Sequence, residues 1–514
     1  MARVSRAEQL RWRLLGYQPS DTLLGWAGPG VVALVGGLLR FWQLGSPHRL
    51  VFDETYYVKQ AYSMLKYGIE MRSSPDIQKH DEFFTNGTPD VFGKTADFVA
   101  HPPAGKWVIA LGEQLFGVDS SFGWRFSVAL LGTVSILMVG RAARRLFGST
   151  FLGIVAAMLL AFEGHHFVHS RTGLLDLIVM FFGFAGFCAL LIDRDRSREV
   201  LSQRLRPSSF GPWLGWRPWR WAAGVLLGLG AATKWSGVFF LAVFALMSVL
   251  WDAGARRAAS VPRWWLGAVL RDGPYAALSL VGAGLVTYVA SWFGWFRSTI
   301  GYDRHWAEQS PGQGPQWLPA ALRSLWKYHQ EMYSFNVGLN SGHPYRTNPW
   351  SWLILGRPTS FDYQGPKRGE AGCTVALCSK AITSIGTPTI WWGATIAVFV
   401  LLFMWALRRD WRAGAVLAGL AGGYLPWFQY QDRTIYSFYT IAFVPWLVLA
   451  CTYVLGLWIG GPTASPRRRR AGLVATCVFV VGTVALFTFF YPVYTSQLLT
   501  YPQWRMRMWF PSWI

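Results

Sequence analysis

The sequence predicts an all-α polytopic membrane protein, and three observations support this fold class. Of the 514 residues, 52% are hydrophobic and 17% aromatic, whereas only 14% are charged. Several apolar runs approach the roughly 20 residues with which an α-helix crosses a bilayer. The formal net charge of +22 gathers in short clusters between these runs instead of along one helix face. This pattern excludes an ordinary soluble fold and argues against a nucleic-acid-binding protein.

The basic clusters orient the chain, because Lys and Arg collect on the cytoplasmic side of membrane proteins. They are residues 3–13, 141–145, 194–206, 256–271, 408–412 and 467–470. Spans placed between them number about eleven. These spans are residues 27–46, 122–144, 149–166, 173–193, 218–233, 235–252, 273–296, 386–407, 411–427, 434–459 and 470–492. Every basic cluster then falls on one side of the membrane.

This topology predicts a cytoplasmic N-terminal segment, residues 1–26, followed by one membrane domain, residues 27–514. The first span has a basic lead-in and no small-residue cleavage site, so we interpret it as an uncleaved signal anchor. Two long loops, 47–121 and 297–385, and the C-terminal tail, 493–514, are expected outside the cytoplasm.

Two further features of this topology concern cysteines and a lysine. Cys373 and Cys378 lie in the second long loop, where an oxidising compartment permits a disulfide, and whether they pair stays open. The two spans that flank Lys234 are short. Short spans indicate tilt, local thinning or a cavity that reaches into the membrane.

Ionisable residues recur at the outer ends of these spans, and a charge at membrane depth is costly unless it serves a site. Asp53 and Glu54 directly follow the first span. Adjacent carboxylates can supply a base for a hydroxyl proton, with the second carboxylate raising the basicity of the first or binding substrate. The alternative is an acidic pair that stabilises the first turn of a helix.

Several cations lie at the same outer level. Lys106 belongs to HPPAGKW, which predicts a short interfacial helix, and it can face an anionic headgroup or simply snorkel. Lys234 and Arg433 end otherwise apolar helices, so together they suit a phosphate joined to an isoprenoid tail. Pairing with Asp432 or with backbone carbonyls is the structural alternative for both.

The turn FEGHHFVHSRTGLLD lies between the third and fourth spans. Its histidines and Glu163 could ligate zinc, but their spacing favours hydrogen bonds that fix the turn, with Arg171 near a phosphate. The segment 342–358 is rich in Pro, Trp and hydrogen-bonding residues, which is typical of a loop over a polar ligand. The sequence contains no nucleotide-binding motif, so a lipid-borne activated donor is the expected energy source.

In these segments the chain resembles the protein O-mannosyltransferases, a family of GT-C membrane glycosyltransferases. The segments that carry the resemblance, in family order, are FDETYYV, HPPAGKW, GWRFSVALLG, HSRTGLLD, TKWSG, HPYRTNPWSW and RTIYSFYTIAFVPW. The second long loop is too short for the folded insertion of eukaryotic relatives, as in the bacterial form. The late motif reads YSFYT where relatives commonly carry a histidine, so no role is assigned to that position.

The resemblance implies a GT-C fold and an inverting transfer of mannose from polyprenyl-phosphate-mannose to Ser or Thr hydroxyls of proteins. The reaction is expected at the outer face of the cell membrane, on acceptors undergoing Sec export, without nucleic acid. By resemblance, Asp53 is the base, while Lys234 and Arg433 stabilise the departing phosphate. The other residues expected to bind substrate are Glu54, Lys106, Arg125, Arg171, His343, Tyr345 and Trp352. No cofactor is certain, and assistance by a divalent cation stays open.

Two other functions remain alternatives at this point. A GT-C enzyme that moves arabinose or aminoarabinose from a lipid phosphate onto glycan or lipid would share the acidic pair. HPYRTNPWSW and HSRTGLLD favour the protein mannosyltransferases over that enzyme. A lipid-linked-sugar flippase would show midplane charges and internal repeats, and the sequence shows neither.

Overall fold

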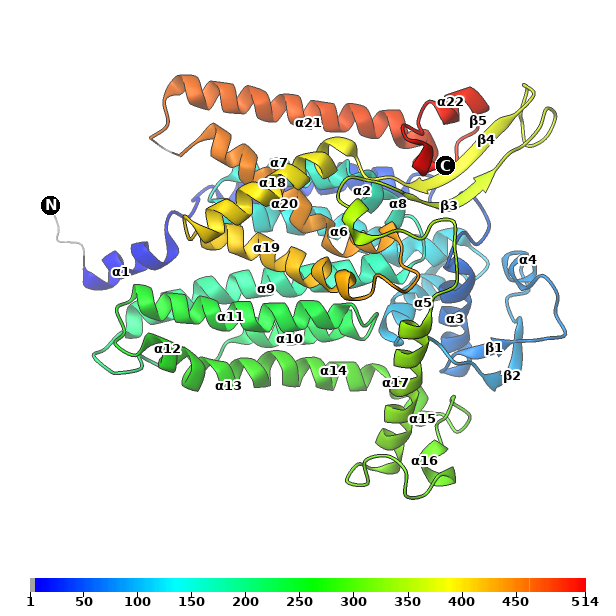
Figure 1. Ribbon diagram of the computed structural model, residues 1–514, viewed down its shortest axis with the longest axis horizontal. Helices are drawn as coiled ribbons and strands as arrows, with labels where there is room; N and C mark the ends of the chain where they lie inside the picture. The colour runs from blue at the N-terminus through cyan, green and yellow to red at the C-terminus, as the bar shows by residue number, and fades with distance from the viewer. Residues whose placement is uncertain (1–4, 462) are drawn as a thin grey trace.

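Most long helices of the protein run in a common direction, and shorter elements cover one end of the bundle they form (Figure 1). The computed structural model describes residues 5–461 and 463–514, so Arg3 of the first basic cluster lies outside the described residues. The bundle helices are α2 (Thr22–Phe41), α6 (Ser121–Phe147), α7 (Thr150–Ala161), α9 (Leu175–Arg204), α10 (Pro218–Ala231), α11 (Gly237–Ala258), α14 (Ala283–Ser291), α18 (Pro388–Ala406), α19 (Trp411–Gly423), α20 (Val444–Ile459) and α21 (Pro466–Tyr494).

The predicted spans all overlap helices of this bundle. Within the described residues, eight helices are long and apolar enough to cross a membrane. Three others, α7, α10 and α19, have only 12, 14 and 13 residues. These are shorter than the roughly 20 residues of a full span. The all-α membrane architecture is therefore confirmed, whereas the number of spans and the side of each terminus stay predictions.

The segment before α14 is continuous helix with two π-helical stretches. It contains α12 (Trp264–Gly267) and α13 (Gly273–Ala276), with π-helix at Ala268–Asp272 and Ala277–Gly282. It packs closely on α10, where a Cβ added at Gly224 would lie 2.1 Å from the carbonyl oxygen of Ser279. Small residues allow such close helix contacts in membranes.

A buried ion-pair network joins α9, α10 and α11 far from the covered end. Arg217 bonds to Asp193 at 2.5 Å and to Asp252 at 2.7 Å, and Arg256 bonds to Asp272 at 2.7 Å. Because buried charges need partners, these pairs fix the register of the helices. The basic clusters at the ends of α6, α9 and α11 lie at this same end of the bundle.

The opposite end is covered by elements of both long loops, by α8 from the turn between α7 and α9, and by α22 from the C-terminal tail (Figure 1). The helices there are α3 (Glu54–Tyr67), α4 (His80–Thr85), α5 (Ala104–Phe116), α8 (Gly164–His169), α15 (Phe293–Arg297), α16 (Trp306–Gln309), α17 (Ala320–Gly338) and α22 (Tyr501–Arg505). The N-terminal helix α1 (Arg6–Leu15) lies at the far end. As predicted, HPPAGKW begins a short helix, α5.

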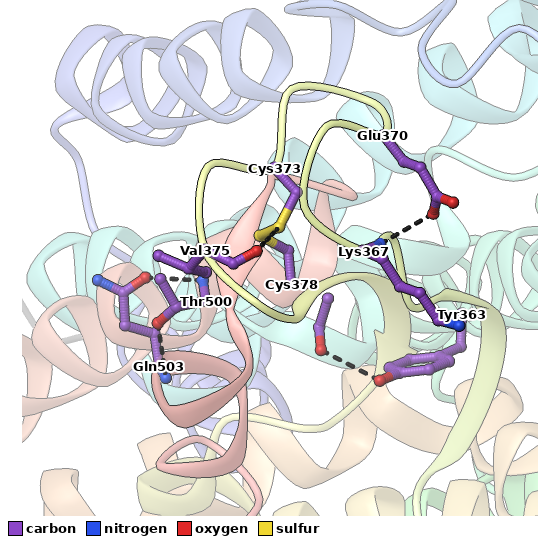
Figure 2. The surroundings of a disulfide bond; sticks show 9 residues. Tyr363, Lys367, Glu370, Cys373, Val375, Cys378, Thr500 and Gln503 are labelled. Carbon is purple, nitrogen blue, oxygen red and sulfur yellow. Dashed lines mark hydrogen bonds between the residues drawn. A yellow bond between two sulfur atoms is a disulfide. The ribbon is translucent and has the colours of Figure 1, made fainter.

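Two small antiparallel sheets complete the covered end. One pairs β1 (Met71–Ser73) with β2 (Phe92–Ala96). The other has the order β3-β4-β5 and contains β3 (Thr359–Gln364), β4 (Cys378–Ser384) and β5 (Leu499–Thr500). Cys373 and Cys378 form a disulfide beside the pairing of Cys378 with Thr500 (Figure 2), which settles the open question of their state. This sheet joins the second long loop to the chain that follows α21.

Candidate active site

A cavity of about 970 Å³ lies where the bundle meets its covering elements. Its polar part contains Asp53, Lys234 and Arg433, and its apolar part is lined by bundle side chains such as Val238 and Leu285. The Lys234 turn joins α10, which has 14 residues, to α11, which has 22, so only the first of the two spans expected to be short is short. Of the three expected explanations, a cavity is found at this turn. This combination suits a ligand with a polar head and an apolar chain.

Asp53 lies immediately before α3 and faces the cavity. Its carboxylate accepts no hydrogen bond from the residues that the structure describes. Burial raises the pKa of Asp53 to about 6, while the charge of Lys234 opposes the rise and that of Asp176 adds to it. A carboxylate without a protein partner and with a pKa near neutrality is suited to accept a proton from a bound hydroxyl.

The backbone before Asp53 is held in an unusual conformation. Phe52 has φ 51°, a left-handed geometry that costs a non-glycine residue roughly 1–2 kcal/mol. Its ring stacks on Phe361 with centroids 4.5 Å apart and meets the edge of Phe438 at 5.1 Å. These aromatic contacts offset the cost of the strained backbone that leads to Asp53.

Glu54 turns away from the cavity and binds Arg125 of α6. Arg125 donates from Nε and Nη2 to the two Glu54 oxygens, at 2.8 and 2.9 Å. Glu54 also accepts from the backbone amides of Val51 and Gly173. Both side chains are almost fully buried. Neither residue lines the cavity, and the polar atoms of both side chains already bind the loop that carries Asp53 or each other, so the expected contact with substrate is not supported by their positions.

The Arg125 guanidinium also donates hydrogen bonds to the backbone. It donates to the carbonyl oxygens of Leu44, Pro47 and Arg49 in the loop between α2 and α3. A loop without regular structure must satisfy its carbonyls in this way when it is buried. Arg125 therefore fixes both the acidic pair and the chain that leads to it.

Lys234 and Arg433 are the two cations of the cavity. Lys234 Nζ pairs with Asp176 Oδ1 at 2.9 Å and lies 4.5 Å from the ring centroid of Tyr439. The Arg433 guanidinium makes no ion pair or hydrogen bond within the described residues, and its Nε is buried without a partner. The partner of Lys234 is thus Asp176 and not Asp432, whereas Arg433 is free to bind an anion.

Two other residues predicted to bind substrate have their cationic groups bound by carboxylate or carbonyl oxygens of the protein. Lys106 is buried, pairs with Glu70 at 2.5 Å and donates to the His101 carbonyl. Arg171 donates to the carbonyls of Leu39, Arg40, Trp42 and Gln43, at the C-terminal end of α2. Helix-terminal carbonyls lack intrahelical partners and attract cations. The predictions that Lys106 and Arg171 contact a headgroup or phosphate are therefore not supported by their positions.

Of the three residues predicted to bind substrate in the segment after α17, only one lines the cavity. His343 lines it and lies 5.2 Å from the ring of Tyr436, between ring centroids. Tyr345 lies outside the cavity lining, with the Arg357 guanidinium 5.2 Å from its ring. Trp352 is buried and donates to Thr347 at 2.7 Å, so it acts as packing beneath the cavity wall instead of lining it.

In the turn between α7 and α9, His165 and His166 form ring hydrogen bonds, as predicted, whereas both ring nitrogens of His169 are buried without a partner among the described residues. Thr440 and Ser384 hydroxyls lie 3.1 and 2.8 Å from the ring nitrogens of His165. Arg40 donates to His166 Nδ1 at 2.9 Å, and Glu163 accepts from the backbone of His166 at 2.6 Å. Among the residues that the structure describes, no three His, Cys, Asp or Glu side chains are grouped to hold a metal ion.

Several cavity residues were not predicted to bind substrate, notably His101, Tyr57 and Tyr439. Burial, followed by the charges of Lys234, Lys106 and Arg433, lowers the pKa of His101 well below its usual value. A neutral imidazole therefore lines the cavity. The HPPAGKW motif was the available signal, but the sequence does not show that its histidine, and not its lysine, faces the cavity.

The helical bundle with its covered end has the GT-C fold of membrane enzymes, as two solved structures show. The chain is similar in structure to the Saccharomyces cerevisiae protein O-mannosyltransferase Pmt1-Pmt2 complex bound to the sugar donor, with TM-score 0.68, 14% identity, and coverage of 98% of this chain and 94% of that one. It is also similar to ArnT from Cupriavidus metallidurans bound to undecaprenyl phosphate, with TM-score 0.50, 16% identity, and coverage of 90% and 70%.

Sequence comparison identifies the family. The model for dolichyl-phosphate-mannose-protein mannosyltransferase matches residues 30–272. The model for the C-terminal four TMM region of protein-O-mannosyltransferase matches residues 321–513. The chain is 38% identical over 514 residues to the polyprenol-phosphate-mannose--protein mannosyltransferase of Mycobacterium tuberculosis, covering 97% of this chain and 93% of the relative. The chain belongs to the protein O-mannosyltransferase family.

Proposed function

We propose that this enzyme transfers mannose from polyprenyl-phosphate-mannose to Ser or Thr hydroxyls of proteins on the extracytoplasmic side of the membrane. The observation that carries the proposal is the single cavity in which the unpartnered Asp53 carboxylate, two cations and apolar bundle side chains meet. The name shared by its full-length relatives supports this donor and this class of acceptor.

The geometry supports a one-step displacement. Asp53 accepts the proton of the acceptor hydroxyl while the hydroxyl oxygen attacks the anomeric carbon of mannose. The bond from that carbon to the phosphate oxygen breaks, and the polyprenyl phosphate leaves with the bonding electrons. Lys234 and Arg433 stabilise the negative charge on the leaving phosphate. Attack opposite to the leaving group inverts the anomeric centre, and the proton later leaves Asp53 for water.

The distribution of charge supports an extracytoplasmic reaction. Asp176 and Asp193 both lie on α9, where 17 residues of separation correspond to about 25 Å along the helix. Asp176 belongs to the cavity end and Asp193 to the end where the basic clusters gather. Because basic clusters favour the cytoplasm, the cavity faces the opposite side. Acceptors reaching that side are proposed to arrive by Sec export.

A direct test compares donors and acceptors in membranes that contain the enzyme. Polyprenyl-phosphate-mannose and polyprenyl-phosphate-arabinose are each incubated with a Thr-containing peptide and with its Thr-to-Ala counterpart. We expect label on the Thr peptide from the mannose donor alone. Transfer of arabinose to glycan or lipid, with no mannose on the peptide, would replace the proposal with the sister GT-C reaction.

The transfer rate is expected to fall in acid because the base must be ionised. With the pKa of Asp53 raised to about 6, the carboxylate is ionised above that pH and protonated below it. The rate should therefore be constant in mildly alkaline buffer and drop about tenfold per unit well below the pKa. Single-turnover rates across the pH range measure this, and a rate that stays constant to about one unit below pH 6 would contradict it.

Arg433→Met is expected to reduce kcat/KM for the lipid donor about 10- to 100-fold, because a hydrogen bond to a charged phosphate contributes about 1.5–3 kcal/mol. The protein should fold normally, since the Arg433 guanidinium has no partner among the described residues. Lys94→Met, at an exposed position of β2 outside the cavity lining, is the matched loss of charge. Equal kcat/KM in the Arg433 and Lys94 variants would remove Arg433 from the donor site.

A further inference from the structure

The helix α17 lies across the direction of the bundle at its covered end, and it extends beyond the bundle beside α14 (Figure 1). Its buried face, which includes Leu325, Tyr328 and Met332, belongs to a cluster with Trp292 and Trp295. Both tryptophans follow directly from α14. The helix is therefore seated on the end of a helix that belongs to a candidate membrane span.

His329 shows which side of α17 is turned toward the membrane. Its Nδ1 donates to Leu325 O at 2.7 Å, so Nε2 accepts from the Tyr288 hydroxyl at 2.6 Å. Tyr288 precedes Trp292 by one helical turn and lies deeper along the span. The side of α17 that carries His329 therefore points along α14 toward the bilayer.

The helical repeat places Leu322, Trp326, Tyr333 and Val337 on the side of His329. We call these four residues the aromatic stripe. Trp326 is 53% exposed, Tyr333 55% and Val337 43%, so about half of each of these side chains is free of protein contact, whereas Leu322 is half-buried. Large apolar side chains that line up on one exposed helix face mark an interaction surface.

The opposite side of α17 is polar and already has partners. Lys327 pairs with Glu331 at 3.0 Å, and its Nζ lies 6.0 Å from the ring centroid of Trp306. Glu331 accepts from the Tyr302 hydroxyl at 3.0 Å. These contacts join that side to the loop between α15 and α17. The helix is thus amphipathic: its polar side is bound to protein, and partly exposed apolar side chains lie on the side of His329.

The surface next to the aromatic stripe indicates its occupant. Leu285 and Val286 of α14, in a candidate membrane span, are 60% and 69% exposed. Leu285 lines the same cavity as Tyr333 and Val337, so the exposed surface of α14 and the stripe meet there. Trp and Tyr favour the boundary between hydrocarbon and headgroups, where amphipathic helices lie in the membrane plane.

We propose that α17 is an interfacial helix whose aromatic stripe lies in the lipid leaflet next to the two long loops. Tyr333 and Val337 also line the cavity together with Val281 and Leu285 of the candidate span. If the proposed function holds, the same attachment fixes α17 over the side of the cavity that the lipid-linked donor passes.

The test measures lipid contact and needs no catalytic activity. Nitroxide labels are placed by Trp326→Cys and, as the adjacent control on the polar side, by Lys327→Cys. Both are made in a full-length background with Cys188, Cys451 and Cys477 replaced and the Cys373–Cys378 disulfide kept. The enzyme is reconstituted in phosphatidylcholine liposomes, and collisions with oxygen and with a water-soluble nickel chelate are measured by EPR.

The label at position 326 is expected to collide several-fold more with oxygen than with the nickel chelate, and the label at 327 to show the reverse. Equal access of the chelate to both positions would overturn the proposal. A proteoliposome assay of mannose transfer by the same variants is scored separately, so loss of the proposed reaction cannot be mistaken for loss of membrane contact.

Discussion

Asp53→Asn is expected to lower the rate of mannose transfer at least about 100-fold while leaving folding unchanged. A positioned general base contributes about 10²- to 10⁴-fold to a rate, and an amide cannot take up the hydroxyl proton. Stability should persist because the Asp53 carboxylate accepts no hydrogen bond within the described chain. Single-turnover transfer to a Thr peptide, with protein quantity and thermal unfolding measured in parallel, checks both halves of the expectation.

Asp76→Asn is the matched control for this substitution. Asp76 lies in the same long loop but is exposed and outside the cavity lining. It should transfer mannose at the wild-type rate. If Asp53→Asn kept a rate within about twofold of Asp76→Asn, another group would have to act as the base.

Arg125→Met is expected to reduce the free energy of unfolding by about 3–5 kcal/mol, the usual cost of leaving one member of a buried ion pair without its partner. The carbonyls of Leu44, Pro47 and Arg49 lose their donor in the same variant. The loss of activity should therefore accompany a fall in the thermal unfolding temperature, unlike the loss in Asp53→Asn. Thermal unfolding in detergent measures the difference.

The double variant Arg125→Met with Glu54→Leu separates the buried charge from the loop contacts. Replacing a whole buried pair by apolar residues is often neutral or stabilising, so the double variant should recover part of the lost stability. Transfer should nevertheless stay low, because the loop before Asp53 remains without its carbonyl donor. An Arg125→Met enzyme that unfolds at the wild-type temperature would show that the pair does not support this loop.

Sequence alone predicted the membrane fold and the core of the candidate site, because both depend on local patterns. Apolar length and basic clusters predicted every helix of the bundle. The outer ends of those spans grouped Asp53, Lys234 and Arg433, and the family resemblance added His343 from the second long loop; all four line one cavity. Their catalytic and binding roles remain proposals.

The sequence could not show which cationic side chains are bound by other residues of the protein and which are available to bind an anionic ligand. Arg171 and Arg433 are both arginines predicted at the outer level of the membrane. The Arg171 guanidinium donates hydrogen bonds to carbonyl oxygens at the C-terminal end of α2, whereas the Arg433 guanidinium has no partner within the described chain. The partner of Lys234 is Asp176, 58 residues away in sequence. Only the packing of α9 against the turn after α10 brings that pair together.

The most direct test of the central claim is the anomeric configuration of mannose on the product peptide. Purified enzyme in liposomes receives polyprenyl-phosphate-mannose and a Thr peptide, and NMR gives the configuration of donor and product. A single displacement with Asp53 as base predicts a mannosylated Thr with the configuration inverted relative to the donor. A retained configuration, or no mannose on the peptide, would contradict the account.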